Sequence, residues 1–239
     1  MNIVAIHQPN FLPWMGFFDK AINASTFILL DDVQFSDGRG NWTNRHLLLS
    51  NNKSKWVTMP ISRKFSGFRK INEISLDSNE EIREKYLEFV IANYNKHPYY
   101  QETIVFLKEI FQFETQNLSE LNIYIINRVI EILGISCGMI IKSSEIAHHG
   151  NGSELLFSLI REVNGTAYLC GDGSSQYLEP QVFAENDIEI SFQNYKPRIY
   201  PQYNQSEFVP GLSILDAMMN CGFSGTRKLL IGSSSDSFS

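Results

Sequence analysis

The sequence predicts an α/β fold with a mainly parallel sheet flanked by helices and a helical insertion around residues 79–133. Three short segments near the start predict it. Residues 3–6 form an apolar run, residues 16–24 have room for a short helix, and residues 26–30 form a second run rich in β-branched and aromatic side chains. A strand, a helix and a second strand in this order are typical of a parallel sheet with a right-handed crossover.

The other elements follow from apolar spacing and turn residues. Residues 119–133 place apolar side chains at Leu121, Ile125 and Val129, which is the spacing of an amphipathic helix, and Gly134 marks its end. We expect further strands at 46–49, 55–61, 139–142, 167–170 and 188–192, further helices at 79–91, 99–111, 152–163 and 213–221, and a helical turn at 181–185.

Length and composition limit the class of protein. The 239 residues are 43% hydrophobic and show no internal repeat or long linker, so we expect one domain over residues 1–230. Residues 231–239 are of low complexity, and we expect a disordered tail there. Acidic residues (26) outnumber basic ones (20), which disfavours a general nucleic-acid binder, and we expect no DNA partner.

The cysteines and the first residues indicate the compartment. Cys137, Cys170 and Cys221 are widely spaced and form no CxxC pair, so no disulfide framework and no metal site is expected. The first residues lack a basic segment followed by a long apolar run, which a signal peptide requires. No stretch approaches the roughly 20 apolar residues of a membrane helix. We therefore expect a cytoplasmic protein that does not insert into membranes.

Polar residues follow the first two predicted strands. His7 and Gln8 come after the first strand, and Asp31 and Asp32 after the second. Ligands of open α/β sheets bind at the carboxyl ends of strands, and a histidine with a pKa near 6.5 suits a general base. The alternative is a loop histidine that organises the neighbouring prolines. Because strand side chains alternate, we expect the two acids to face opposite sides, with His7, Arg39 or Arg45 as partners.

Three later segments contain further candidates. Arg45, beside Asn44, offers a two-pronged donor for phosphate or carboxylate. Residues 171–173 form a glycine-rich turn after a strand, which either cradles a phosphate or is an ordinary turn. His148 and His149 are expected to be exposed to solvent. Residues 195–203 combine aromatic side chains with polar ones, a composition that suits stacking on a sugar or base as well as ordinary packing.

In these segments the sequence resembles the WbqC-like family of bacterial proteins along nearly the whole chain. The most specific stretch is IHQPNFLPWMGFFDKAINASTFILLDDVQF at 6–35, followed by NWTNR at 41–45, WVTMPI at 56–61, YLCGDGSSQYL at 168–178 and YPQYNQSEFVPGLSILDAMMNCG at 200–222. Cys170 stands where relatives usually have serine, which argues against a nucleophile there. The resemblance implies a role in O-antigen, lipopolysaccharide or other surface-polysaccharide biosynthesis. The implied activity is acyl or aminoacyl (glycine-type) transfer to the amine of a nucleotide-linked amino sugar.

On this hypothesis His7, oriented by Asp31 or Asp32, takes a proton from the amine, and Gln8 or Asn10 donates to the developing oxyanion. Arg45 holds a phosphate. A thioester, an aminoacyl-tRNA and an acyl-adenylate all remain open as the acyl donor, with an acyl-carrier protein as a further partner and no certain cofactor. The substrate-binding candidates are Asn10, Trp14, Gln34, Asn44, Arg45, Gly171, Asp172, Gly173, Tyr200 and Gln202.

Two other functions are compatible with the sequence. The opening strand, loop, helix and strand vaguely resemble the HIGH-motif nucleotidyltransferases, in which a histidine pair and a helix N-terminus bind ATP phosphates. This chain lacks the second histidine of that motif. A non-catalytic sugar-binding protein of the same pathway is the third possibility, because no complete catalytic triad is visible.

Overall fold

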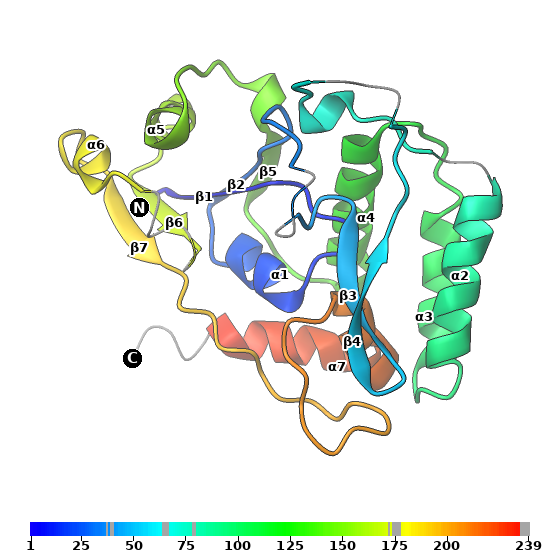
Figure 1. Cartoon of the computed structure of the whole chain (residues 1–239). Helices are drawn as coiled ribbons and strands as arrows, with labels where there is room; N and C mark the ends of the chain where they lie inside the picture. Colours follow the sequence, from blue (N-terminus) through cyan, green and yellow to red (C-terminus); the bar gives the residue numbers. More distant parts are fainter. Residues whose placement is uncertain are drawn as a thin grey trace.

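A parallel sheet forms the centre of the computed structural model, which describes residues 1–36, 38, 41–63, 67–77, 80–171, 173 and 178–234. Five strands pair in parallel in the order β5-β2-β1-β6-β7 (Figure 1). The predicted α/β class is therefore confirmed. The strands are β1 (Ile3–His7), β2 (Thr26–Leu29), β5 (Met139–Lys142), β6 (Ala167–Cys170) and β7 (Glu189–Phe192).

The chain adds strands first on one side of β1 and then on the other. The chain passes from β1 outward to β2 and β5, then returns to the other side of β1 for β6 and β7. Side chains of β1 alternate between the two faces, since Val4 and Ile6 join one hydrophobic cluster and Ala5 joins the other. Helices α5 (Gly152–Glu162) and α6 (Pro180–Ala184) cover the first face, and α1 (Met15–Ile22) covers the second (Figure 1). The reversal point lies between β1 and β6.

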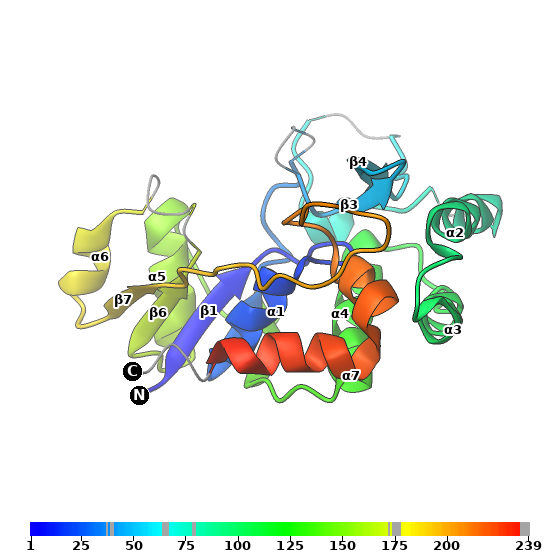
Figure 2. The same cartoon turned by 90° about the horizontal axis from the view of Figure 1, so that it is seen from below.

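The predicted helical insertion contains α2 (Glu80–Tyr94), α3 (Tyr100–Ile110) and α4 (Leu118–Leu133). Helices α2 and α3 lie side by side away from the sheet, while α4 packs against α7 (Figures 1 and 2). Gly134 ends α4 in the left-handed conformation at φ 58°, as its position predicted. An antiparallel hairpin of β3 (Arg45–Ser50) and β4 (Lys53–Thr58) precedes the insertion. Short 3₁₀ turns lie at η1 (Ile71–Glu73) and η2 (Ser143–Glu145).

The last helix is longer than predicted. Helix α7 spans Ile214–Ser234, whereas the sequence suggested an end at 221. Gly222 does interrupt it, with φ 69°, and the two parts meet at an angle (Figure 2). The helix resumes because Glu102 Oε1 accepts from Phe223 N at 3.2 Å, which serves a donor at the start of the second part. Residues 231–234, expected in the tail, are therefore helical, and 235–239 lie outside the described residues.

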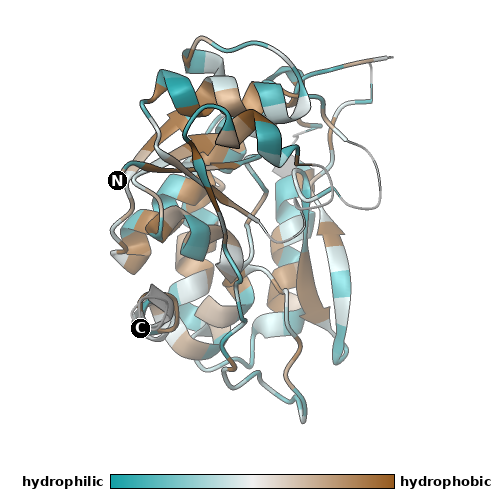
Figure 3. Ribbon diagram, turned by 90° about the vertical axis from the view of Figure 1, so that its left-hand side faces the viewer, coloured by the Kyte–Doolittle hydropathy of each residue, from teal (hydrophilic) through white to brown (hydrophobic). Residues whose placement is uncertain are grey.

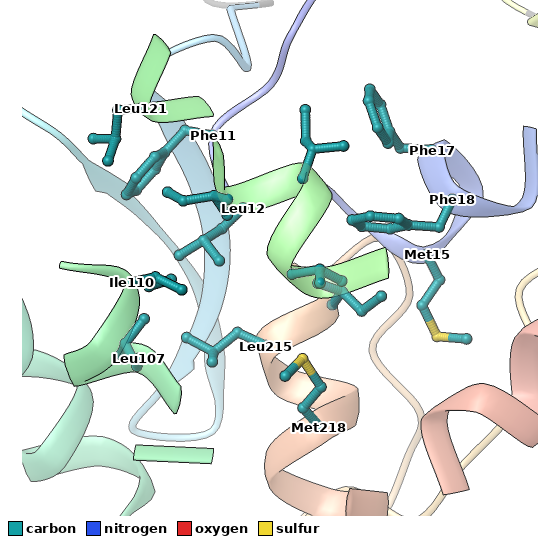
Figure 4. Close-up of a cluster of buried hydrophobic side chains, with 14 of the residues drawn as sticks. Phe11, Leu12, Met15, Phe17, Phe18, Leu107, Ile110, Leu121, Leu215 and Met218 are labelled. Carbon is teal, nitrogen blue, oxygen red and sulfur yellow. The ribbon is translucent and has the colours of Figure 1, made fainter. Parts of the chain in front are cut away.

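In the main hydrophobic core, the loop after β1 packs against helices that are far apart in the sequence. Figure 4 shows Phe11 and Leu12 of that loop against Ile110 of α3, Leu121 of α4 and Leu215 of α7. In Figure 3 hydrophilic and hydrophobic residues alternate along the helices, as amphipathic helices that cover a core require.

The backbone of this loop is buried and takes its hydrogen bonds from distant segments. Asn122 Nδ2 donates to Pro9 O at 2.8 Å and to Thr43 O at 2.7 Å. Ser213 Oγ donates to Leu12 O at 2.7 Å. Leu12 has φ 41°, a left-handed conformation that costs leucine about 1–2 kcal/mol and is retained because its surroundings fix it.

Replacing Asn122 with alanine should therefore destabilise the whole chain. Asn122→Ala leaves the carbonyls of Pro9 and Thr43 buried without this donor, and we expect a loss of about 3 kcal/mol in the free energy of unfolding. Urea denaturation measures it. The control Asn95→Ala changes an exposed asparagine and should shift the same free energy by about 0.5 kcal/mol or less. Equal effects of the two substitutions would contradict this role of Asn122.

Candidate functional site

Two carboxylates converge at the ends of β2 and β5. Ser143 Oγ lies 3.1 Å from Asp31 Oδ1 and 2.5 Å from Asp32 Oδ1. Ser144 donates to Asp31 twice, from its backbone N at 3.0 Å and from Oγ at 2.8 Å. The expectation that the two acids face opposite sides was wrong. Strand β2 ends at Leu29, so strand alternation no longer holds at 31 and 32, where the chain has left the strand and begins to bend.

A histidine that the sequence analysis assigned to solvent belongs to this cluster. His148 is half-buried, and its Nε2 lies 3.0 Å from Oδ2 of Asp32, whose side chain is 7% exposed. Lys70 Nζ lies 3.9 Å from the same oxygen. His148 Nδ1 faces Ile146 O at 2.9 Å, so the ring can donate to both oxygens only when both nitrogens carry a proton. Among the described residues, Asp31 and Asp32 therefore pair with neither His7 nor Arg45. The third expected partner, Arg39, lies outside the described residues.

His7 ends β1, next to β2. Its Nδ1 lies 2.9 Å from Gln8 O, and its ring meets Phe17 edge-on at 4.9 Å. Burial, followed by the charge of Lys20, lowers the pKa of His7 to about 4. The ring is therefore neutral at pH 7. Since Nδ1 faces a carbonyl that can only accept, this geometry assigns the proton to Nδ1 and the lone pair to Nε2.

Lys20 places a positive charge between β1 and β6. It is 3% exposed, and its Nζ donates to Ile6 O at 3.1 Å. The pairing of β1 with β6 ends at Ala5 and Leu169, so Lys20 binds the strand where the two separate. A Cβ built on Gly171 would lie 3.9 Å from Nζ. Lys20 was not among the predicted site residues, although a charged residue in the apolar segment MGFFDKAI was a usable signal.

Arg45 and Asn44 lie in the hairpin region and stabilise a turn. Arg45 Nε donates to Asn41 O at 2.7 Å, and its guanidinium lies 4.4 Å from the centre of the Trp56 ring. Asn44 Nδ2 donates to Met59 O at 3.0 Å, and its Oδ1 accepts from Asn41 at 2.7 Å. These contacts occupy both side chains with protein groups.

The remaining predicted residues are dispersed. Asn10 is buried in the loop after β1, and Trp14 lies over Gly16 and meets Tyr195 edge-on. Gln8 is half-buried, and its carbonyl faces His7. Gln34 is exposed and pairs through its backbone with Lys70, Gly173 is exposed, and Asp172 lies outside the described residues.

Tyr200 and Gln202 belong to a buried network around Asp216. Asp216 accepts from Tyr94 at 2.9 Å, from Tyr200 at 2.8 Å and from Gln202 at 3.3 Å. Burial raises the pKa of Asp216 to about 6, although these hydrogen bonds oppose the shift. The network ties the segment around 200 to α7 and α2.

The described residues contain neither a cluster suited to a metal ion nor a helix suited to a membrane. In that part of the chain no group of three or more His, Cys, Asp and Glu side chains is arranged to hold a metal ion. None of the helices described combines the length and apolar character needed to cross a membrane.

The chain is similar to known proteins along most of its length. The WbqC-like protein family matches residues 8–228. A relative from Mycobacterium tuberculosis (strain ATCC 25618 / H37Rv), uncharacterized protein Rv1507c, is 31% identical over 227 residues, which cover 93% of this chain and 95% of the relative. No solved structure matches the chain significantly.

The Asp216 network predicts a pH-dependent stability. Because the folded pKa is about 6 and the ordinary value is 3.8, the folded chain binds this proton more tightly. Its stabilising contribution is complete below about pH 4 and is lost as pH rises through 6. Relative to Asp216→Asn, the free energy of unfolding of the wild type should fall by about 3 kcal/mol between about pH 4 and 7. Urea denaturation at several pH values measures both; parallel profiles would contradict the assignment.

Proposed function

The chain belongs to the WbqC-like protein family, and a neutral histidine, a buried lysine and two carboxylates lie at or near the ends of its parallel strands. From these observations we propose that it is an acyltransferase. The acceptor is the amine of a nucleotide-linked amino sugar, and the pathway is surface-polysaccharide (O-antigen) biosynthesis. The observation that carries the proposal is the separation of charge at the strand ends, with Lys20 between the ends of β1 and β6 and with Asp31 and Asp32 beyond β2.

Lys20 and Asp32 carry charges opposite to those of the phosphates and of the amine of such an acceptor. A nucleotide-linked amino sugar carries negative phosphates and, at neutral pH, a protonated amine. Lys20 attracts the phosphates at the reversal point of the sheet, which is where open α/β sheets bind ligands. Asp32 attracts the amine, and His148 and Lys70 hold this carboxylate in place. This arrangement replaces Arg45 as the proposed phosphate ligand.

His7 lies on β1 between these two charges and removes the proton. Nε2 takes one proton from the ammonium group, which frees the nitrogen lone pair to attack the acyl carbonyl carbon. The C–N bond forms as the bond from the carbonyl carbon to the leaving group breaks, and the proton on His7 goes to the leaving group. The second proton that the nitrogen must lose to become an amide is released to solvent. We assign the oxyanion donor to Gln8, since Asn10 is 4% exposed and Gln8 is half-buried beside His7.

Removing the base should lower the turnover number. His7→Ala should reduce kcat about a hundredfold with a small change in KM, because general-base catalysis contributes at least that much. The assay pairs nucleotide-linked amino sugars with acyl thioesters, aminoacyl-tRNA and acyl-adenylates. In the wild type, kcat/KM should decline as pH falls through about 4, the pKa of His7 in the free protein.

A loss of less than tenfold in kcat, or a decline centred near pH 6.5, would exclude His7 as the base. Binding of an amino-sugar nucleotide without turnover with any donor would indicate a sugar-binding protein instead.

Removing the buried ammonium should weaken phosphate binding. Lys20→Met keeps the apolar stem and removes the charge, so the Kd of a nucleoside diphosphate should rise roughly tenfold or more, as expected for one charge-assisted hydrogen bond. Calorimetry measures Kd. Lys96→Met removes an exposed lysine in the turn after α2 and should leave Kd unchanged. Unchanged binding in folded Lys20→Met would contradict this role.

A further inference from the structure

A cavity of about 380 Å³ lies between the edge strand β5 and helix α4. Its size falls within the range of about 300–1,000 Å³ that is usual for small-molecule sites. Leu29 of β2, Ile140 of β5 and Ile123 of α4 supply apolar wall. Phe113 and Tyr124 supply an aromatic wall, in which the two rings stack at 4.1 Å with an angle of 10°. These walls favour an apolar or aromatic group.

The charged residues of the cavity disfavour an anion. Lys142 Nζ lies 2.7 Å from Glu145 Oε1, so the one positive charge among the described residues that line the cavity is paired. Glu120 adds a second carboxylate, which leaves an excess of negative charge. A phosphate or carboxylate at this opening would meet repulsion, whereas an uncharged group would not.

The cavity and the carboxylate cluster share the ends of two strands. Leu29 and Lys142 line the cavity and are the last residues of β2 and β5. Two residues after Leu29 comes Asp31, and directly after Lys142 comes Ser143, which binds both carboxylates. A group in the cavity therefore lies beside the place proposed for the attacking amine, on the side away from Lys20.

We propose that this cavity holds the acyl group of the donor and that this group is apolar or aromatic and carries no negative charge. The inference rests on the proposed function and specifies its second substrate. The base of the nucleotide is the weaker occupant, because the phosphates attached to it would lie against Asp31, Asp32 and the acidic opening of the cavity.

The test uses hexanamide and benzamide as uncharged probes and hexanoate as the charged counterpart of the first. In ¹³C-methyl NMR spectra of the wild type, both amides should shift the methyl signals of Ile123 and Ile140, and hexanamide should bind at least tenfold more tightly than hexanoate. Ile123→Trp fills the cavity and should weaken hexanamide binding at least tenfold. The control Ile132→Trp makes the same change at an exposed position of α4 and should bind like the wild type.

Absence of these methyl shifts, equal binding of hexanoate, or shifts produced by uridine but not by the amides would overturn the inference. The comparison on the wild type stands even where Ile123→Trp fails to fold. Hexanamide binding that Ile123→Trp removes, in a chain without transferase activity, would retain the cavity site and reject the proposed function. Acyl transfer that is unaffected by Ile123→Trp and shows no preference for apolar acyl groups would retain the proposed function and reject the cavity site.

Discussion

The structure depends on hydrogen bonds to the buried backbone that follows β1. A carbonyl removed from water must find a donor, and the two prolines of this loop have no N–H with which to pair in a regular ladder. Asn122 of α4 serves Pro9, and Ser213, before α7, serves Leu12. Helices α4 and α7, which are far apart in the sequence, are thereby fixed to the loop that follows the central strand β1, whose last residue is His7.

This anchoring positions the charges on which the functional proposal depends. The loop leads directly into α1, which returns Lys20 to the carbonyl of Ile6. On the other side of His7, the cluster of Asp31, Asp32 and Ser143 closes the ends of β2 and β5. Because the strands are parallel, all these groups lie near the carboxyl ends of the strands. Positive charge lies on one side of His7 and negative charge on the other. The arrangement suits a substrate with charges of both signs.

Much of the fold was predictable because its signals are local. The apolar runs of β1 and β2, the spacing of α4 and the stop at Gly134 are all visible within a few residues. Helix α7 was cut short because Gly222 resembles a helix end, and the contact that restarts the helix comes from Glu102, 121 residues away in sequence.

The candidate site was predictable only where one segment carries it. His7 and the acids could be found from strand ends, but the pairing of Asp32 with His148 joins segments more than a hundred residues apart. Applying the same rule to β5 would have identified Ser143. Residue type alone did not indicate the contacts of Arg45, whose Nε and Nη2 donate to the backbone carbonyls of Asn41 and Gly38 in its own turn.

On the proposed function, the substrate binds across the carboxyl ends of β1, β2 and β6. Backbone amide NMR with a panel of nucleotide-linked amino sugars tests it most directly. The largest shift changes should fall at His7, Lys20, Asp32 and Gly171, with little change in the β3–β4 hairpin. Changes confined to the hairpin around Arg45 and Trp56, with none at the strand ends, would contradict it.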